Sequence, residues 1–333
     1  MTIPSRPLGS SVPGVLLFNL GGPETLEDVR PFLFNLFSDP EIIRIKNNFL
    51  RRLLAWFIAT TRQGKSRRLY QDIGGGSPLR KITEAQAAAL QERLEALGYP
   101  ARTYIGMRCW RPFIEEAIQE IEHAGTLRLL ALPLFPQYSV STTGSCLSYF
   151  KQVLDDRGLA SRIEVSYIKS WFDEPLYIDA MAETIQAAME KFSDQEPNQI
   201  HILYSAHSIP ARYVTEGDPY LEQTKRTVSL INTRLGNLSP STLAFQSKVG
   251  PVKWLEPSTK SVLQQLGRDG TKKLLVVPVS FVSDHVETLQ EIDILYRQIA
   301  MSAGIQEFHR AAALNLTPKF IDALAALVIR DLG

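Results

Sequence analysis

The chain has 333 residues, of which 44% are hydrophobic and 21% are charged, and its formal net charge is +1. This composition is typical of a globular protein long enough for two domains, and it excludes an intrinsically disordered chain. The nearly neutral charge provides no field that would attract nucleic acid, so no nucleic-acid partner is expected.

The cellular compartment follows from the cysteines and the N-terminus. Cys109 and Cys146 lack metal-ligand spacing and are too few for a disulfide scaffold, which favours a reducing compartment. Residues 1–14 contain no apolar signal-peptide core and are predicted to be a short flexible lead-in. We therefore expect a cytoplasmic protein.

Short apolar runs alternate with helical patterns along the chain. Strand-like runs occupy residues 14–20, 101–107, 126–136, 161–168, 198–207, 241–249 and 272–282. Amphipathic helical patterns occupy residues 83–98, 111–125, 218–236, 256–267 and 317–332. Continuous apolar strands separated by helices are typical of parallel strands that are buried on both faces, so the sequence predicts an α/β fold.

The two halves of the chain resemble each other. Residues 129–142, LLALPLFPQYSVST, and 274–287, LLVVPVSFVSDHVE, share leucines and a proline at the same spacing, so that Pro133 matches Pro278. This pseudo-repeat predicts two similar Rossmann-like, doubly wound domains at 1–165 and 166–333, with a seam near residues 160–175 and a last helix that can pack back on the first domain. Ligands of such sheets bind beyond the carboxyl ends of the strands.

One segment of the first half is unusually apolar and basic. Within residues 49–68 the uncharged run 53–61 is much shorter than the roughly 20 residues of a membrane span. The pattern fits a core helix with a solvated basic face. It equally fits an apolar lip that touches a membrane surface or admits a hydrophobic ligand.

Histidines and carboxylates gather at the predicted strand ends. His207 ends one strand, and His285 and Glu287 follow another, with Glu291 four residues further on. Asp284 is explained as a helix cap. The other carboxylates are not explained in this way, because a solvated helix face usually mixes charges of both signs and no Lys or Arg lies between residues 284 and 296.

Several other kinds of site do not fit these residues. His285 and Glu287 lack the HExxH spacing of a zinc protease, and neither Ser205 nor Ser208 lies in a G-x-S-x-G elbow. The glycine-rich motifs at 19–23 and 72–78 lack the spacing of a P-loop or a dinucleotide site. What remains is a place through which metal ions or protons pass without being held tightly.

Five motifs together resemble one family. NLGGP, IGGGSPL, PQYSVSTTGS, SAHSIP and SFVSDHVETLQEID occur in this order over nearly the whole chain, which is similar to ferrochelatases, lyases of haem biosynthesis that insert Fe²⁺ into protoporphyrin IX. The resemblance implies two Rossmann-like domains that enclose a porphyrin cleft. It also implies that residues 41–70, here called the lip segment, form a mobile lip of the cleft.

The resemblance assigns roles to matching residues. His207 and Glu287 would be the catalytic and metal-contacting pair on opposite sides of the porphyrin. His285 and Asp284 would supply hydrogen bonds around Glu287, and Glu291 would continue an acidic track for metal or protons. Porphyrin-binding positions would be Arg108, Tyr138, Ser139, Ser141, Phe281 and Leu20, where some relatives have a metal-ligating Tyr or a Met at the position of Leu20.

Expected partners follow from the same resemblance. Fe²⁺ and protoporphyrin IX would be substrates, with no tightly bound cofactor and no iron-sulfur cluster, because the chain has two cysteines where cluster-bearing relatives use four. A monomer or homodimer with peripheral membrane association is expected. The alternatives are a coproporphyrin, cobalt or sirohydrochlorin chelatase and a tetrapyrrole carrier without turnover.

Overall fold

The computed structural model describes residues 12–193, 196–248, 250 and 252–332. Residues 1–11, which belong to the predicted lead-in, lie outside the described residues. The first half contains β1 (Gly14–Asn19), α1 (Val29–Ser38), α2 (Asn48–Asp72), α3 (Leu79–Ala96), β2 (Arg102–Met107), α4 (Ile114–His123), β3 (Arg128–Pro133), the π-helix η1 (Val140–Gly144), α5 (Ser145–Asp156) and β4 (Glu164–Tyr167).

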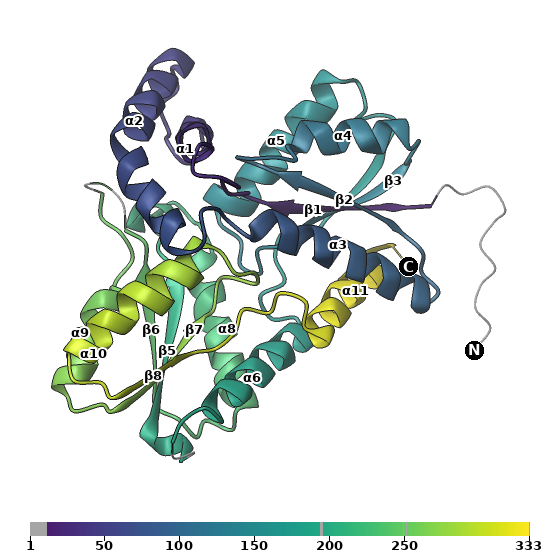
Figure 1. The fold of residues 1–333 in the computed structure, drawn as a ribbon. Coiled ribbons are helices and arrows are strands. Elements are labelled where there is room, and N and C mark those ends of the chain that lie inside the picture. Colours follow the sequence, from purple (N-terminus) through teal and green to yellow (C-terminus); the bar gives the residue numbers. More distant parts are fainter. Residues whose placement is uncertain (1–11, 194–195, 249, 251, 333) are drawn as a thin grey trace.

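The second half repeats this alternation of strands and helices (Figure 1). It contains α6 (Pro175–Met189), the 3₁₀ helix η2 (Pro197–Gln199), β5 (Ile200–His207), α7 (Ala211–Thr215), α8 (Tyr220–Arg234), β6 (Ser241–Gln246), α9 (Thr259–Arg268), β7 (Lys273–Pro278), the π-helix η3 (Glu287–Tyr296), α10 (Arg297–Ser302), β8 (Glu307–Arg310) and α11 (Pro318–Leu332).

Two four-stranded parallel sheets confirm the predicted α/β fold. Their strand orders are β2-β1-β3-β4 and β6-β5-β7-β8, which are the same order in each half. Pro133 ends β3 and Pro278 ends β7, so the sequence repeat corresponds to equivalent strands. The correspondence continues beyond the strands, because each of these two strands is followed by a loop and then a π-helix, η1 or η3.

Alternation along the strands divides the hydrophobic core into layers. Val15 and Leu17 of β1 face a large cluster that also contains residues of β5, β7, α6 and α11, whereas Leu16 and Phe18 face α4 and α5. A further cluster lies between the second sheet and α9 and α10. Since side chains alternate between the faces of a strand, each sheet is covered on both faces, as expected for a doubly wound domain.

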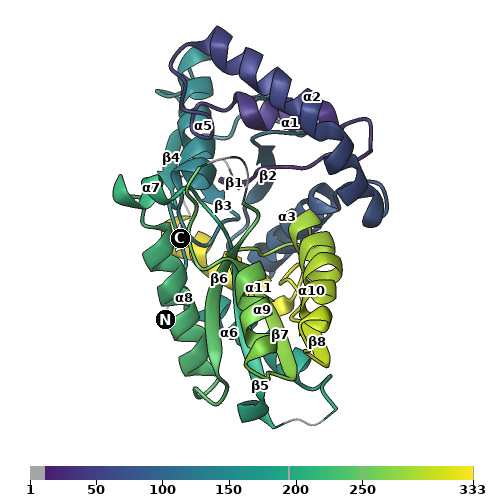
Figure 2. The same ribbon diagram turned by 90° about the vertical axis from the view of Figure 1, so that its left-hand side faces the viewer.

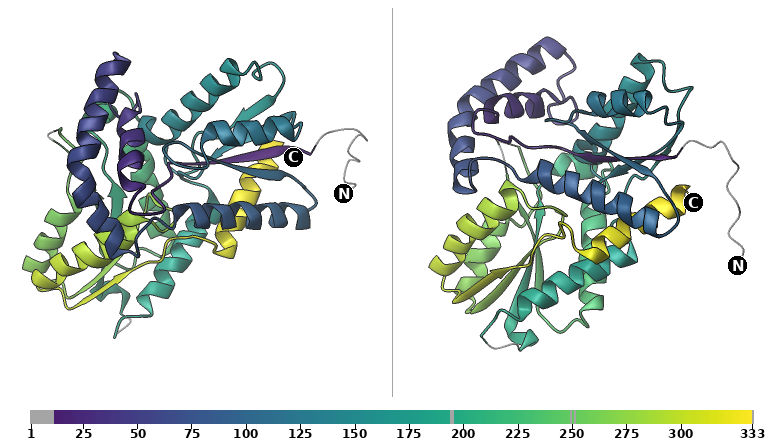
Figure 3. Two further views of the ribbon diagram at one scale, coloured as in Figure 1. Left: turned by 45° about the horizontal axis from the view of Figure 1, so that its top comes forward. Right: turned by 45° about the vertical axis from the view of Figure 1, so that its right-hand side comes forward.

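The chain crosses from the first sheet to the second after β4. Trp171 lies at this crossing, where its indole N–H donates to the carbonyl of Pro133 at 2.8 Å and its ring meets Tyr177 edge to face. The C-terminal helix α11 then packs against α3 and α6, and the three helices lie between the two sheets (Figure 3). The second half of the chain is thereby fastened to the first.

The two glycine-rich motifs pack against each other. Gly21 has φ of +85°, and a Cβ atom there would lie 2.8 Å from Cβ of Trp110. A Cβ atom on Gly76 would lie 2.0 Å from the carbonyl oxygen of Glu24. Close approach therefore explains Gly21 and Gly76, whereas Gly74 and Gly75 have open space around them and φ of +102° and +99°, a conformation that glycine adopts most readily.

Helices α1 and α2 pack on each other and form the top of the molecule in Figure 2. Most large apolar side chains of α2 are exposed, and its buried residues are Ala55, Ala59, Ser66 and Tyr70, which contradicts the interpretation as a core helix. Exposed fractions are 73% for Phe49, 53% for Leu53, 50% for Trp56 and 58% for Phe57. No helix among the described residues combines the length and apolar character needed to cross a bilayer.

Candidate active site

The carboxyl ends of β5, β6 and β7 bring the candidate residues together. His207 is the last residue of β5 and pairs in register with Gln246, the last residue of β6. On the other side of β5, Ser205 pairs with Pro278 at the end of β7. The loop after β7 carries Phe281 and His285 into η3. Parallel strands thus place residues distant in sequence at one edge, as the sequence predicts.

The backbone fixes the orientation and tautomer of His207. Its Nδ1 lies 2.7 Å from the carbonyl oxygen of Ser208, which can only accept, so Nδ1 carries the proton. The backbone N–H of His207 donates to the hydroxyl of Ser280 at 2.9 Å, and its backbone carbonyl accepts from the phenol of Tyr220 at 2.8 Å. Among the described residues nothing bonds to Nε2. In the neutral ring, Nε2 is therefore a free base.

Phe281 lies close to both histidines. Its ring centroid is 6.1 Å from that of His207, in an edge-to-face arrangement, and 4.4 Å from that of His285. An apolar ring beside two imidazoles provides a surface on which a flat aromatic molecule can pack.

His285 and Glu287 form a close pair after β7. Nδ1 of His285 donates to the carbonyl of Ser283 at 2.9 Å, and Nε2 lies 3.1 Å from Oε2 of Glu287. The two side chains are only 14% and 26% exposed, so the contact between them lies in a mostly water-excluded place.

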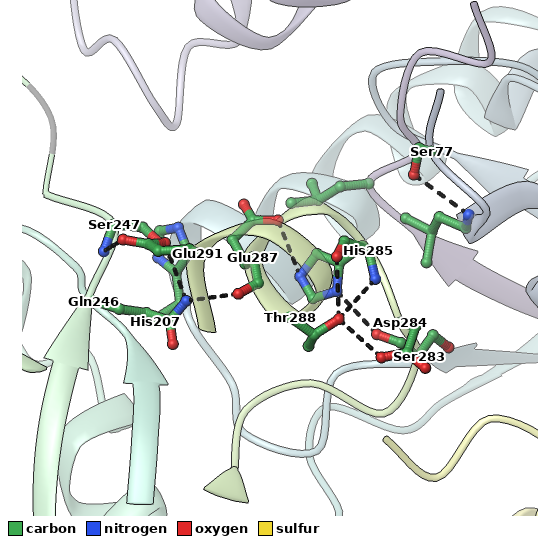
Figure 4. A network of polar contacts seen from close by, with 12 residues as sticks. Ser77, His207, Gln246, Ser247, Ser283, Asp284, His285, Glu287, Thr288 and Glu291 are labelled. Atoms are coloured by element: carbon green, nitrogen blue, oxygen red, sulfur yellow. Dashed lines mark hydrogen bonds and ion pairs between the residues drawn. The ribbon is translucent and has the colours of Figure 1, made fainter. Parts of the chain in front are cut away.

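Glu291 is bound by donors on all sides. Its carboxylate accepts from Nε2 of Gln246 (3.1 Å), from the N–H (3.2 Å) and hydroxyl of Ser247, and from the phenol of Tyr296 (2.7 Å). Burial, and then the charge of Glu291, raise the pKa of Tyr296, so the phenol stays protonated and donates. Figure 4 shows Glu287 between His285 and this group. Glu291 thus anchors η3 to the end of β6.

Asp284 bonds to partners other than Glu287, which differs from the expected role around that carboxylate. Its Oδ1 accepts from Nη1 of Arg310 (3.0 Å) and from Thr288 (2.9 Å), and its Oδ2 accepts from Nδ2 of Asn315 (2.8 Å). An ionised carboxylate only accepts hydrogen bonds, so Asp284 serves Glu287 by holding the loop.

The guanidinium of Arg108 interacts with side chains of the first half of the chain. Its Nε bonds to Oδ2 of Asp39 at 3.1 Å and to Ser145 at 3.0 Å, and its guanidinium lies 4.1 Å above the ring of Tyr149. The Asp39 side chain is 1% exposed. Arg108 therefore neutralises a buried carboxylate at the end of α1, and its contact with a porphyrin stays a prediction.

The other predicted residues of the first domain lie at the boundary with the second. The N–H of Tyr138 donates to Gln223 at 2.7 Å, and the hydroxyl of Ser139 donates to Asp218 at 2.9 Å. The hydroxyl of Ser141 lies 3.1 Å from that of Ser139. Leu20 packs in an apolar cluster of α1 and α2 residues that also includes Val286, the neighbour of Glu287.

Tyr70 and Arg62 on α2 are candidates that the motif analysis missed. Burial, and then the charge of Glu287, raise the pKa of Tyr70, which places a neutral phenol near that carboxylate. Arg62 lies eight residues earlier on the same helix face, about 12 Å away. Burial lowers the pKa of Arg62, whose guanidinium lies 5.8 Å from the ring centroid of Phe37, and no carboxylate pairs with it in the described part of the chain.

Gln246, Arg310 and Asn315 were missed as well. Gln246 is 1% exposed, accepts from Ser205 at 2.5 Å, and donates to Glu291 and to the carbonyl of Glu287. Its position at a strand end was the available signal. Within the described ranges, no cluster of three His, Cys, Asp or Glu side chains forms a metal cage.

Comparisons with known proteins identify the family of the chain. A family model described as Ferrochelatase matches residues 12–332. The ferrochelatase of Gloeothece citriformis (strain PCC 7424) is 53% identical over 320 residues, which are 96% of this chain and 82% of that protein. The ferrochelatase of Gloeobacter violaceus (strain ATCC 29082 / PCC 7421) is 51% identical over 321 residues, 96% of this chain and 98% of that protein.

A solved structure shares the fold. SirB from Bacillus subtilis, solved with Fe³⁺, has a TM-score of 0.57 and 14% identity, with coverage of 96% of this chain and 95% of SirB. At this identity the likeness concerns the fold alone. The family model and the relatives cover the strand ends, the loop after β7 and η3 alike, and they show that the chain belongs to the ferrochelatase family.

Proposed function

We propose that the chain is a ferrochelatase that inserts Fe²⁺ into protoporphyrin IX, releases two protons and forms protohaem in haem biosynthesis. The observation that carries the proposal is the free Nε2 of His207 together with the close pair of His285 and Glu287, with Phe281 beside both histidines. Removing pyrrole protons requires bases near neutral pKa beside an apolar aromatic substrate.

His207 is the first proton acceptor in this proposal. Its tautomer leaves Nε2 unprotonated, and the bond from Nδ1 to Ser208 stabilises the imidazolium that forms when Nε2 takes a pyrrole proton. The pair of His285 and Glu287 is the second proton acceptor or the metal contact in this proposal.

Fe²⁺ is a substrate that has to be released to the porphyrin. His207 and Glu287 offer one nitrogen and one carboxylate, a weak donor set compared with a structural metal site of four protein ligands. Imidazole and carboxylate ligands also suit Zn²⁺, so Zn²⁺ should compete with Fe²⁺. We propose that no resident cofactor takes part.

The macrocycle packs on Phe281 in this proposal, and the lip segment covers it. Protoporphyrin carries two propionate carboxylates on one edge. Arg62, which is half-buried and has no carboxylate partner among the described residues, supplies a charge that binds one of them. Its place about 12 Å along α2 from Tyr70 puts it at the rim when the ring centre lies near Glu287.

A metal-insertion assay tests the proposal. The purified protein is mixed anaerobically with protoporphyrin IX and Fe²⁺ or Zn²⁺, and the metalloporphyrin is followed by absorbance and fluorescence. We expect turnover with both metals. Coproporphyrin in place of protoporphyrin tests the alternative substrate. Tight porphyrin binding without metal insertion would identify a carrier and contradict the proposal.

The exposed side chains of α2 predict membrane association. We propose a cytoplasmic protein that touches a membrane through these side chains, as a monomer or homodimer. Replacing Trp56, Phe57 and Ile58 by serine should reduce sedimentation with anionic vesicles and raise the porphyrin KM, because apolar area is lost from the lip segment. Leu127→Ser, which removes an exposed leucine outside the lip segment, is the control. Unchanged partitioning and KM would contradict this role.

A further inference from the structure

Asn315 makes three hydrogen bonds to the loop that leads from β7 into η3. Its N–H donates to the carbonyl of Val282 at 2.8 Å, its Oδ1 accepts from the N–H of Asp284 at 2.9 Å, and its Nδ2 donates to Oδ2 of Asp284 at 2.8 Å. This one residue therefore fixes the chain on both sides of Ser283.

The backbone conformation at this position also favours asparagine. Asn315 has φ of +43°, in the left-handed region that Gly and Asn adopt more readily than other residues. The turn follows Leu314, which is fully buried, and precedes α11, which begins at Pro318. Conformation and side-chain bonding thus restrict the residue type in two independent ways.

The segment that Asn315 holds sets the orientation of His285. The carbonyl of Ser283 accepts from Nδ1 of His285, and Nε2 on the opposite side of the ring faces Glu287. Thr288 donates to Asp284 and accepts from the N–H of His285 at 3.1 Å. A displacement of Asp284 would therefore move His285 and Glu287 together.

The charges near position 315 explain why this residue carries an amide and not a carboxylate. Arg310 bonds to Asp284 (3.0 Å) and Asp293 (2.9 Å); burial lowers its pKa, but these two carboxylates outweigh burial and raise it. The guanidinium of Arg310 is thus already shared between two carboxylates. An aspartate at position 315 would oppose Asp284, whereas the amide of Asn315 donates to it and accepts from its N–H.

The same junction joins the two domains. Gln86 of α3 is fully buried, and its Nε2 donates to the carbonyl of Asn315 at 2.8 Å and to the hydroxyl of Ser283 at 3.0 Å. Through the bond from Gln86 to Ser283, the loop that orients His285 is therefore attached to the first domain.

We infer that Asn315 is a positioning residue for the pair of His285 and Glu287 in metal insertion, an inference that rests on the proposed function. It acts through Asp284 and the carbonyl of Ser283 and contacts neither substrate. Gln86 makes this positioning depend on the contact between the domains.

The test compares Asn315→Gly and Asn315→Ala in the Zn²⁺ and protoporphyrin assay, with kcat and both KM values measured. Both variants lose the amide, but glycine keeps the left-handed backbone freedom. We expect each to lower kcat by about 10-fold to 100-fold, as is usual for residues that orient metal-site ligands. The porphyrin KM should stay the same, because Phe281 and the lip segment are untouched. Asn237→Gly, at an exposed position with φ of +54°, is the control.

A charge exchange gives a second, independent readout. Asn315→Asp should lose more turnover than Asn315→Ala, and adding Asp284→Asn should restore part of it, because the exchange rebuilds an amide–carboxylate pair. Parental kcat in Asn315→Gly, or no rescue in the double variant, would overturn the inference. A parent protein that inserts no metal would instead overturn the proposed function. Thermal unfolding of each variant shows whether it is folded.

Discussion

His207→Ala is expected to lower the kcat of metal insertion by about 100-fold to 10,000-fold, the range for loss of a general base. The reason is geometric. The bond from Nδ1 to Ser208 leaves Nε2 as the only basic atom of this ring, and no other described side chain bonds to it. Porphyrin affinity should change little, since Phe281 and the lip segment remain. Stopped-flow metal insertion and fluorescence quenching on porphyrin binding measure the two quantities separately.

The control is His123→Ala, which removes an exposed histidine at the end of α4. It should leave kcat and porphyrin affinity unchanged. If His207→Ala keeps parental kcat, the pyrrole protons leave by another group, and the proposal for His207 is wrong. If kcat and porphyrin affinity fall together, His207 contributes mainly to substrate binding.

Periodicity and repetition predicted most of the fold. All seven strand-like runs correspond to β1–β7, because buried parallel strands have long apolar runs. The short strand β8 (Glu307–Arg310) was missed. It contains Glu307, His309 and Arg310 around one buried Phe308, so it carries no apolar run. Only pairing with β7 makes it a strand.

The π-helical geometry of η3 was not predictable from the sequence. A spacing of four residues between Glu287 and Glu291 puts both on one side of an α-helix and of a π-helix alike, so the pattern does not distinguish them. The two carboxylates have different partners: Glu287 faces His285, whereas Glu291 is tied to Ser247 and Tyr296. Contacts between segments distant in sequence therefore engage Glu291 and leave Glu287 as the carboxylate available for catalysis.

Residue types at strand ends identified the reactive groups but not what holds them. His207 ends one predicted strand and His285 follows another, which made them candidates. Arg310 and Asn315 come from an edge strand and a loop, and their partner Asp284 lies 26 and 31 residues away. Nothing in the local pattern links them. Likewise, the composition of α2 left its orientation open until its large apolar side chains proved to be exposed.

Glu287→Gln is expected to reduce kcat by about 100-fold or more, since it removes both an acceptor of protons and a charged ligand for the metal. Glutamine keeps the size of the side chain and can still accept from Nε2 of His285, so the structure of η3 should persist. However, an amide cannot take up a proton as a carboxylate can. The KM for Zn²⁺ should rise, and the porphyrin KM should stay close to that of the parent.

The comparison with Glu120→Gln, an exposed glutamate of α4, controls for the general effect of removing a negative charge. Unchanged turnover in Glu287→Gln would leave His207 as the only base that the chemistry needs and would reduce Glu287 to a partner that orients His285. Turnover lost without any rise in the KM for Zn²⁺ would separate the two roles, because it would mean that Glu287 moves protons and does not contact the metal. We expect turnover to fall and the KM for Zn²⁺ to rise while porphyrin binding is retained, because the carboxylate of Glu287 lies in contact with Nε2 of His285 and is proposed to meet the metal.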